Sequence, residues 1–485
     1  MRLFRALIIG SLGFTLAAPT AGATVREWLM RGVELNPSVL RSAPSVRLAG
    51  MGDVGLCVAD EANELNTHDF GMNVAGVLED SDRWVVESWM GGTTVVADCL
   101  GSSSERRYGN AGSQAVYRSE NWALGVDINW TYFEYDDKPG DWGRVRGPVI
   151  AGLLNKRFGW VTLGMCIGNE SENEDCLSED AFTVEHSQNR CLGQIGAEMK
   201  LGGWVIGGAW DFERGDVEGA SEDPARFHRD EFSWVCPVDR YSASIIFPFG
   251  EKIEGGIRAR IMNREGGETV NVSWSDTWPM NPSKSTYFDN VGTFCEEVTD
   301  AELSTRWRFR LGGGMVLGLA GGYWDYEREI QEGVNQKGSD RAGRCSSDGL
   351  SAGVGISRSF MTDRLLVAIQ ARGSQGDLEI VEEKIGTTGT TRDVRVSVGA
   401  EYFPATEFAL RLGLQGGSRD RDIDAPLTLS LVSGITGGIS WLPRGGTVQV
   451  HGALTYMRQE RWNERAVDLE DTDDLSYLVG LRLLL

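Results

Sequence analysis

The feature that most constrains this chain is an alternation of apolar and polar side chains with a period of two residues. In residues 122–132 every second residue is apolar, and those between are small or polar. Residues 303–311, 394–402 and 408–414 repeat the pattern. Successive side chains of a β-strand point to opposite faces, so each segment predicts a strand with one apolar face.

A soluble β-sandwich also alternates, but three features favour a transmembrane antiparallel up-and-down β-barrel. The predicted strands are about 10 to 13 residues long, enough to cross a bilayer at a tilt. Long polar connections alternate with tight ones at Ser119–Glu120, Gly202–Gly203, Gly250, Gly312, Thr362–Asp363 and Ala405. Aromatic residues predict two interfacial girdles: Trp122, Trp160, Trp204 and Trp441 beside the tight turns, and Trp130, Trp210, Trp324 and Tyr326 towards the long connections.

The N-terminus has the pattern of a cleaved signal peptide. Arg2 and Arg5 form a basic start, residues 6–18 are apolar, and residues 21–23 supply a cleavage site of small residues. A retained anchor is the alternative, but the apolar run is shorter than the roughly 20 residues of a spanning helix. We therefore expect a signal peptide at 1–23, an N-terminal segment at 24–82, and a barrel at 83–485.

From about residue 83 to 485 the sequence predicts one ascending strand, about eight hairpins and a final strand, which gives 18 strands as the best count within a range of 14 to 18. The last strand, from Asp474, has an apolar set that begins at Tyr477 and ends at Leu485. It resembles the C-terminal signal of outer-membrane barrels, except that the final residue is not aromatic. A mean hydropathy of −0.24 is compatible with this class, because lumen-facing residues dilute the lipid-facing ones. We expect a monomer in the lipid of the cell outer membrane.

The charged residues divide between the two faces of the predicted wall. The net charge of −23 disfavours nucleic-acid binding, yet basic residues gather on the predicted lumen face. They either pair with carboxylates such as Glu254 and Glu401, or favour anions and grip the carboxylate of a ligand. The candidate lumen and ligand residues are Arg258, Arg260, Arg306, Arg308, Arg395, Arg411, Glu401 and His451.

Eight cysteines are many for a barrel, and most fall in or beside predicted external loops. The best single disulfide candidate joins Cys176 to Cys191 across one loop. We expect no metal site, because no Cys-x-x-Cys pair occurs and only four histidines are present. Catalytic partners for His451 are not evident, so we expect neither an enzyme nor a cofactor.

The N-terminal segment lacks sustained alternation and carries a motif of its own. Met51-Gly52-Asp53 is followed by Val58-Ala59-Asp60 and then by Asn73-Val74-Ala75-Gly76. This pattern resembles the FadL-like outer-membrane transport superfamily, which includes PorV-type proteins. The resemblance implies a hatch inside the barrel lumen, with Met51, Gly52, Asp60, Asn73, Ala75 and Gly76 as its motif residues. Asp53 and Val74 depart from the family pattern, and a lead-in that seats the first strand is the alternative.

Two functions remain open from the sequence. The resemblance implies passive or facilitated passage of a small hydrophobic or amphipathic molecule, and the arginines of the predicted lumen face leave an anionic solute open. The alternative is a secretion-accessory or structural barrel, PorV-like, that holds a secreted protein partner through its loops.

Overall fold

The fold is seen in a computed structural model of the chain. It describes residues 46–51, 53–58, 73–77, 83–99, 102–136, 142–177, 183–223, 228–235, 237–276, 286–334, 341–382, 385–423, 425–443, 448–463 and 466–484. The predicted signal peptide lies outside these residues, and the boundaries predicted at 23 and 82 remain predictions. The first strand begins at Arg83.

The described residues form a single β-sheet. Its first strands are β1 (Arg83–Cys99), β2 (Ser102–Arg118), β3 (Trp122–Asp136), β4 (Trp142–Phe158), β5 (Val161–Leu177), β6 (Thr183–Leu201), β7 (Trp204–Asp223), β8 (His228–Val235), β9 (Val238–Phe249) and β10 (Ile253–Asp276). The rest are β11 (Thr286–Gly312), β12 (Met315–Val334), β13 (Arg341–Phe360), β14 (Leu365–Glu382), β15 (Ile385–Ala405), β16 (Phe408–Ile423), β17 (Ala425–Trp441), β18 (Val448–Asn463) and β19 (Ala466–Leu484).

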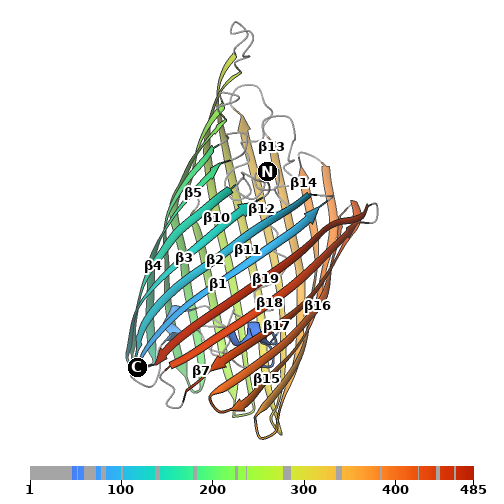
Figure 1. Ribbon diagram of the computed structural model, residues 1–485. Coiled ribbons are helices and arrows are strands. Elements are labelled where there is room, and N and C mark those ends of the chain that lie inside the picture. Colours follow the sequence, from blue (N-terminus) through green and yellow to red (C-terminus); the bar gives the residue numbers. More distant parts are fainter. Residues whose placement is uncertain are drawn as a thin grey trace.

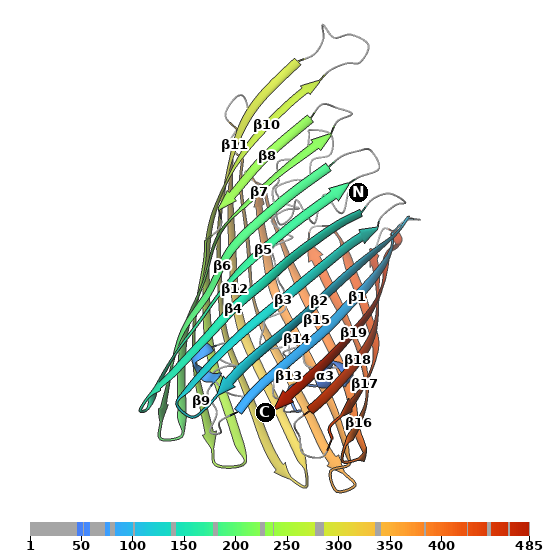
Figure 2. The ribbon, with the colours of Figure 1, turned by 60° about the vertical axis from the view of Figure 1, so that its left-hand side comes forward.

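The sheet closes on itself into a barrel (Figures 1 and 2). Each strand is antiparallel to its neighbours, and β1 pairs with both β2 and β19, so no edge is left open. The strands β8 and β9 both lie between β7 and β10, and they meet at Pro237, which has no N–H to donate. The 19 strands therefore occupy eighteen positions around the barrel, and the predicted count of 18 is confirmed.

The two faces of the wall have opposite character, as the alternation predicts. On β11, Leu303 is 53% exposed on the outside, whereas Ser304 and Arg306 are buried on the inside. On β16, Leu410, Leu412 and Leu414 face outward. A closed sheet with an apolar outer band satisfies its backbone internally and suits a bilayer. The chain is thus a transmembrane barrel of the outer-membrane type.

The strands are longer than predicted, reaching 27 residues in β11, because regular pairing continues beyond the apolar band. Short turns gather at one end, near the C-terminus (Figure 1). Glycines with positive φ make several of these turns, among them Gly202 and Gly203. Short turns mark the periplasmic end of such barrels.

The outer aromatic girdle differs from the prediction on β12, where Trp324 and, by alternation, Tyr326 lie on the lumen side. Trp130 and Trp210 are exposed on the lipid face, but Trp324 is 5% exposed and points inward. Its ring lies so close to Gly349 and Gly376 that neither could carry a side chain. Because facing alternates along β12, the neighbouring Tyr323 takes the outward place.

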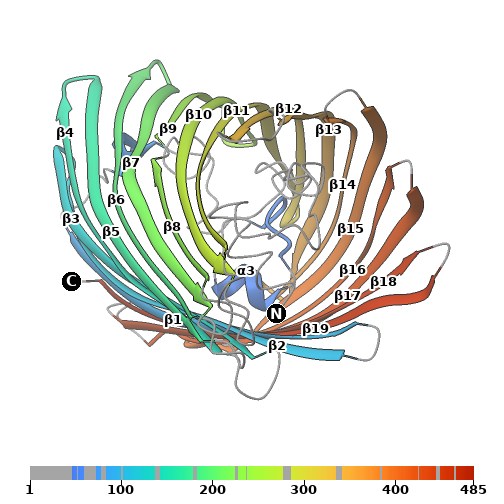
Figure 3. The ribbon, with the colours of Figure 1, turned by 90° about the horizontal axis from the view of Figure 1, so that it is seen from above.

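Two short helical turns lie inside the barrel. They are α3 (Val46–Gly50) and η4 (Val74–Val77). Seen from above, α3 lies within the ring of strands (Figure 3). Among the described residues no helix combines the length and apolar character needed to span a membrane.

Candidate functional site: the hatch seat in the lumen

The N-terminal segment is held against the inner wall at two separate places. We call residues 46–58 the first hatch segment and residues 73–77 the second. Gln370, which is 1% exposed on β14, makes both of its amide contacts to the first segment. Its Oε1 accepts the Leu56 N–H at 2.8 Å, and its Nε2 donates to the Asp53 carbonyl at 3.1 Å. The Ser357 hydroxyl of β13 donates to the Cys57 carbonyl at 2.8 Å.

Apolar packing and a close approach of the two backbones complete the contact between the first hatch segment and the wall. Leu48, Met51, Val54 and Val58 form a buried cluster with Ala368 of the wall. Two inward-facing glycines let the hatch backbone lie directly on the strands. A Cβ at Gly318 would lie 2.1 Å from the Leu56 carbonyl oxygen, and one at Gly399 would lie 2.3 Å from that of Met51. Glycine is needed at both positions because backbone, rather than a flexible side chain, occupies the space.

The second segment is held by uncharged amides on β4 and β6. Asn73 is fully buried, donates to the Ala197 carbonyl at 2.8 Å, and accepts the Ala75 N–H at 2.9 Å. Asn155 donates to the Val74 carbonyl at 2.6 Å, and Gln194 accepts the Val74 N–H at 2.5 Å. These contacts satisfy backbone groups that the turn itself leaves unpaired.

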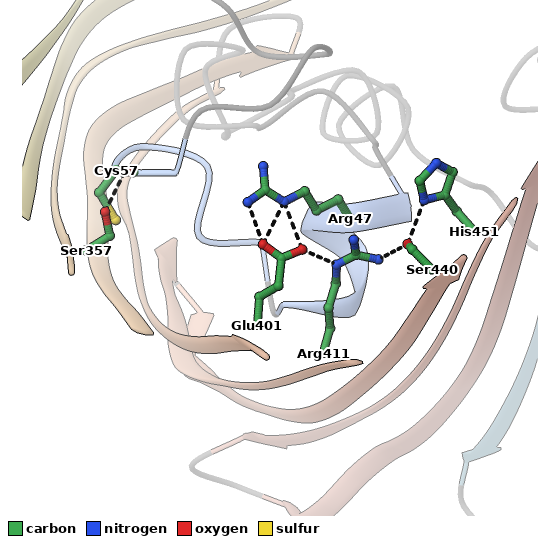
Figure 4. A network of polar contacts seen from close by, with 7 residues as sticks. All are labelled: Arg47, Cys57, Ser357, Glu401, Arg411, Ser440 and His451. Carbon is green, nitrogen blue, oxygen red and sulfur yellow. Dashed lines mark hydrogen bonds and ion pairs between the residues drawn. The ribbon is translucent and has the colours of Figure 1, made fainter. Parts of the chain in front are cut away.

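A chain of charged and polar groups links α3 to four strands (Figure 4). Arg47 of α3 reaches Glu401 of β15 with an N–O distance of 2.5 Å. The same carboxylate accepts the Arg411 Nε of β16 at 2.8 Å. Arg411 also donates to Ser440 of β17, whose Oγ lies 2.6 Å from Nδ1 of His451 on β18. Glu401 is 1% exposed and is shared by the buried Arg411 and the half-buried Arg47.

A second ion pair joins the first hatch segment to the wall. Arg372 of β14 lies 2.9 Å from the Asp53 carboxylate. Arg308 of β11 donates weakly to the Gly55 carbonyl at 3.4 Å and lies 3.7 Å from Glu254. The hatch is thus contacted by charged side chains from β11, β14 and β15.

The predicted lumen arginines all face inward, and Arg258, Arg260, Arg308, Arg395 and Arg411 lie beside carboxylates of the wall. Arg258 lies 2.8 Å from Glu302, and Arg260 lies 2.7 Å from Asp300. Arg395 lies 3.2 Å from Asp393. Arg306 is buried on the same face of β11. This geometry favours the pairing interpretation of these residues, and their contact with a ligand stays a prediction.

The hatch motif is placed in part. Met51, Asn73 and Ala75 are fully buried in the two segments, and Gly76 donates its N–H to the Asn73 carbonyl. Gly52 and Asp60 lie outside the described residues. The sequence did not point to Gln370, Ser357, Gln194, Asn155 or Arg47. The sequence signal that could have identified the wall residues is the presence of polar amides and hydroxyls at inward-facing positions near the tight turns.

The predicted disulfide between Cys176 and Cys191 is wrong. Cys191 is a free, exposed cysteine. Along this hairpin Cys176 lies opposite Val184, whereas Cys191 lies opposite Asn169. The predicted loop is paired strand, and the two cysteines are seven register steps apart, roughly 23 Å at the usual rise, which no disulfide spans.

Cys57 is the cysteine that the hatch buries. It has a free thiol, and burial raises its pKa to about 12. Its Sγ lies beside the Ser357 hydroxyl (Figure 4). A thiol in such surroundings is unreactive as long as the hatch stays seated.

The barrel is similar to solved outer-membrane transporters. Ralstonia pickettii toluene transporter TbuX is 9% identical, with a TM-score of 0.37 over 91% of this chain and 98% of that one. Pseudomonas putida toluene transporter TodX is 10% identical, with a TM-score of 0.37 over 91% and 98%. The ferric citrate transporter FecA is 9% identical, with a TM-score of 0.43 over 84% and 79%.

The chain resembles FadL-family hydrocarbon transporters over most of its length. At these identities and TM-scores the likeness carries no argument about what the chain transports, and the fold rests on its own strand pairing. No protein-family model matches the sequence, and no curated protein is similar to it.

Proposed function

We propose that this barrel passes small hydrophobic or amphipathic molecules across the outer membrane, and that the hatch controls their passage. The observation that carries the proposal is that the lumen is occupied by a separate segment, seated on the wall through side-chain contacts. An eighteen-stranded barrel encloses more space than its own side chains fill. A segment that is not part of the sheet can move without breaking the ladder.

The chemistry of the seat supports an uncharged or amphipathic solute. Beneath the hatch the wall offers apolar side chains, with Ala368 and Leu366 on one side and Ile246 and Ala320 on the other. Displacement of the hatch would turn this apolar surface towards the lumen. Because the arginines described above have carboxylate partners, they offer little net charge to select an ion.

A reversible lock on the hatch tests the proposal. In a Ser357→Cys variant the new thiol lies beside Cys57, so oxidation is expected to join hatch and wall. We expect the oxidised barrel to lose uptake of a small aromatic hydrocarbon into proteoliposomes, and dithiothreitol to restore it. The matched control is the double variant Cys57→Ser, Ser357→Cys, which is expected to respond to neither treatment. Equal uptake by the locked and reduced forms would contradict the proposal.

The secretion-accessory alternative stays a prediction. Within the described residues no feature favours it over passage of a solute. A pull-down of secreted proteins with the intact barrel would test it directly.

A further inference from the structure

A hollow on the lipid-facing side of the wall is separate from the hatch seat. Its volume is about 860 Å³, and it lies over the outward face of β10 to β15. Its floor is a row of direct cross-strand partners in which Gly321 pairs with Ala352 and Ala352 pairs with Gly373. The row continues through Thr305 to Ile257 on one side and reaches Val394 on the other. The volume falls in the range of pockets that hold small organic ligands.

A second hollow lies directly beside the first. It has a volume of about 490 Å³, extends over β15 and β16, and includes Val394, Leu414 and Gly416 in its lining. Val394 lines both hollows and forms the ridge between them. Two adjacent apolar hollows with one ridge fit a molecule that has two hydrocarbon chains.

The rim of the first hollow is polar and carries a cation. One step towards the outside, Gln375 pairs with Arg392 on β15, two residues beyond the ridge at Val394. Arg392 is exposed and makes no hydrogen bond or ion pair with any residue that the structure describes. Asp420 is opposite Arg392 in the register, but no ion pair joins them. The arginine therefore lies where two chains in the hollows would converge.

An acidic row follows one step further out. Asp325 pairs with Asp348, and Asp348 pairs with Asp377, and all three side chains are exposed on the outer face. Like charges directly opposite one another destabilise a sheet. From the bilayer outward the surface is thus apolar, then carries Arg392 with Asp420 opposite it on β16, and then is acidic.

We propose that this surface binds a glycerophospholipid with a phosphoethanolamine headgroup. The acyl chains lie in the two hollows on either side of Val394. The phosphate meets Arg392 and Gln375, and the ammonium group beyond it meets Asp348 and Asp377. The order of charges selects a zwitterionic lipid, because an anionic headgroup would meet the aspartates with no cation of its own.

The test is native mass spectrometry of the full chain in detergent, incubated with equal amounts of phosphatidylethanolamine, phosphatidylglycerol and lipid A. We expect the wild type to retain phosphatidylethanolamine in preference to the other two. Arg392→Gln should lower retention about tenfold, the loss expected for one charge-assisted contact. The double variant Asp348→Asn, Asp377→Asn should retain phosphatidylethanolamine and phosphatidylglycerol alike.

Filling the hollow tests the acyl site itself. Gly373→Leu has room, since a Cβ there meets nothing nearer than 3.4 Å, and it should abolish retention. Gly152→Leu is the matched control on β4, where a Cβ meets only one carbonyl oxygen at 4.0 Å. Equal retention by these two variants would overturn the proposal. Preference of the wild type for phosphatidylglycerol or lipid A, or no retained lipid, would also overturn it.

Discussion

The two hatch segments are held in the same lumen by different chemistry. The first segment adds ion pairs to its amide and hydroxyl contacts: Arg47 and Asp53 each reach an opposite charge on the wall. The second uses amides: Asn73, Asn155 and Gln194 bond to backbone groups. Removing one member of a buried ion pair leaves an uncompensated charge, whereas removing an amide leaves only an unsatisfied neutral group. The charged contacts of the first segment are therefore expected to be more sensitive to a single substitution than the amide contacts of the second.

The largest effect is expected from Glu401→Gln. This change leaves Arg47 and Arg411 without their shared carboxylate, at a cost of about 3–5 kcal/mol that is divided between the wall, through the buried Arg411, and hatch seating, through the half-buried Arg47. The readout is the rate of Cys57 alkylation in the folded barrel, in a background where the other seven cysteines are serine. Faster alkylation with unchanged heat-modifiable migration on a gel would show hatch release without loss of the barrel.

Asp393→Asn is the matched control for that variant. Asp393 is also buried on β15 and pairs with Arg395 and Arg419, neither of which has a described contact with the hatch. It should weaken the wall but leave Cys57 protected. Equal exposure of Cys57 in both variants would contradict a specific role for Glu401.

A smaller effect is expected from Gly318→Val. The added side chain would meet the Leu56 carbonyl, so the hatch must shift, at a cost of about 1–3 kcal/mol. Alkylation of Cys57 should rise less than in Glu401→Gln. Gly321→Val, on the outer face of the same strand, serves as the control because a Cβ there has only ordinary contacts. If Gly318→Val leaves Cys57 as protected as the control does, the close approach is not needed.

A substitution in the amide contacts of the second hatch segment is expected to release that segment alone. Asn73→Ala removes bonds to Ala197 and Ala75, at a cost of about 1–3 kcal/mol. Protease cleavage near residue 73 should increase while Cys57 stays protected. Release of both segments together would show that they are held as one unit, and would contradict independent binding of the two segments.

The smallest effect is expected from pH. The folded pKa of Cys57 is raised to about 12 from an ordinary value of 9.0, so the neutral thiol favours the seated hatch. That stability is fully present below pH 9 and is lost as the pH rises through 12. Between pH 7 and pH 9 hatch seating should not change, as measured by protease protection of the hatch. A clear loss of protection in this range would require another titrating group.

The sequence predicted the strands of the barrel wall better than the contacts between the wall and the hatch inside it. Alternation depends on neighbours in the chain, so the outward leucines of β16 and the strand count followed from it. The hatch seat depends on pairs far apart, such as Arg47 and Glu401, which are 354 residues apart. No local pattern contains that information. The predictions for Trp324 and for the cysteine pair failed for a related reason. A shift of one residue reverses the direction of a side chain, as at Trp324, and an unknown strand register can separate two expected partners, as with Cys176 and Cys191.

Single-channel conductance in planar bilayers measures directly whether the hatch closes the lumen. We predict that the wild-type barrel is silent and that deletion of residues 24–82 leaves a large, steady pore, because the hatch and not the wall fills the lumen. Silence in both forms would contradict it, since the wall's own side chains would then close the barrel.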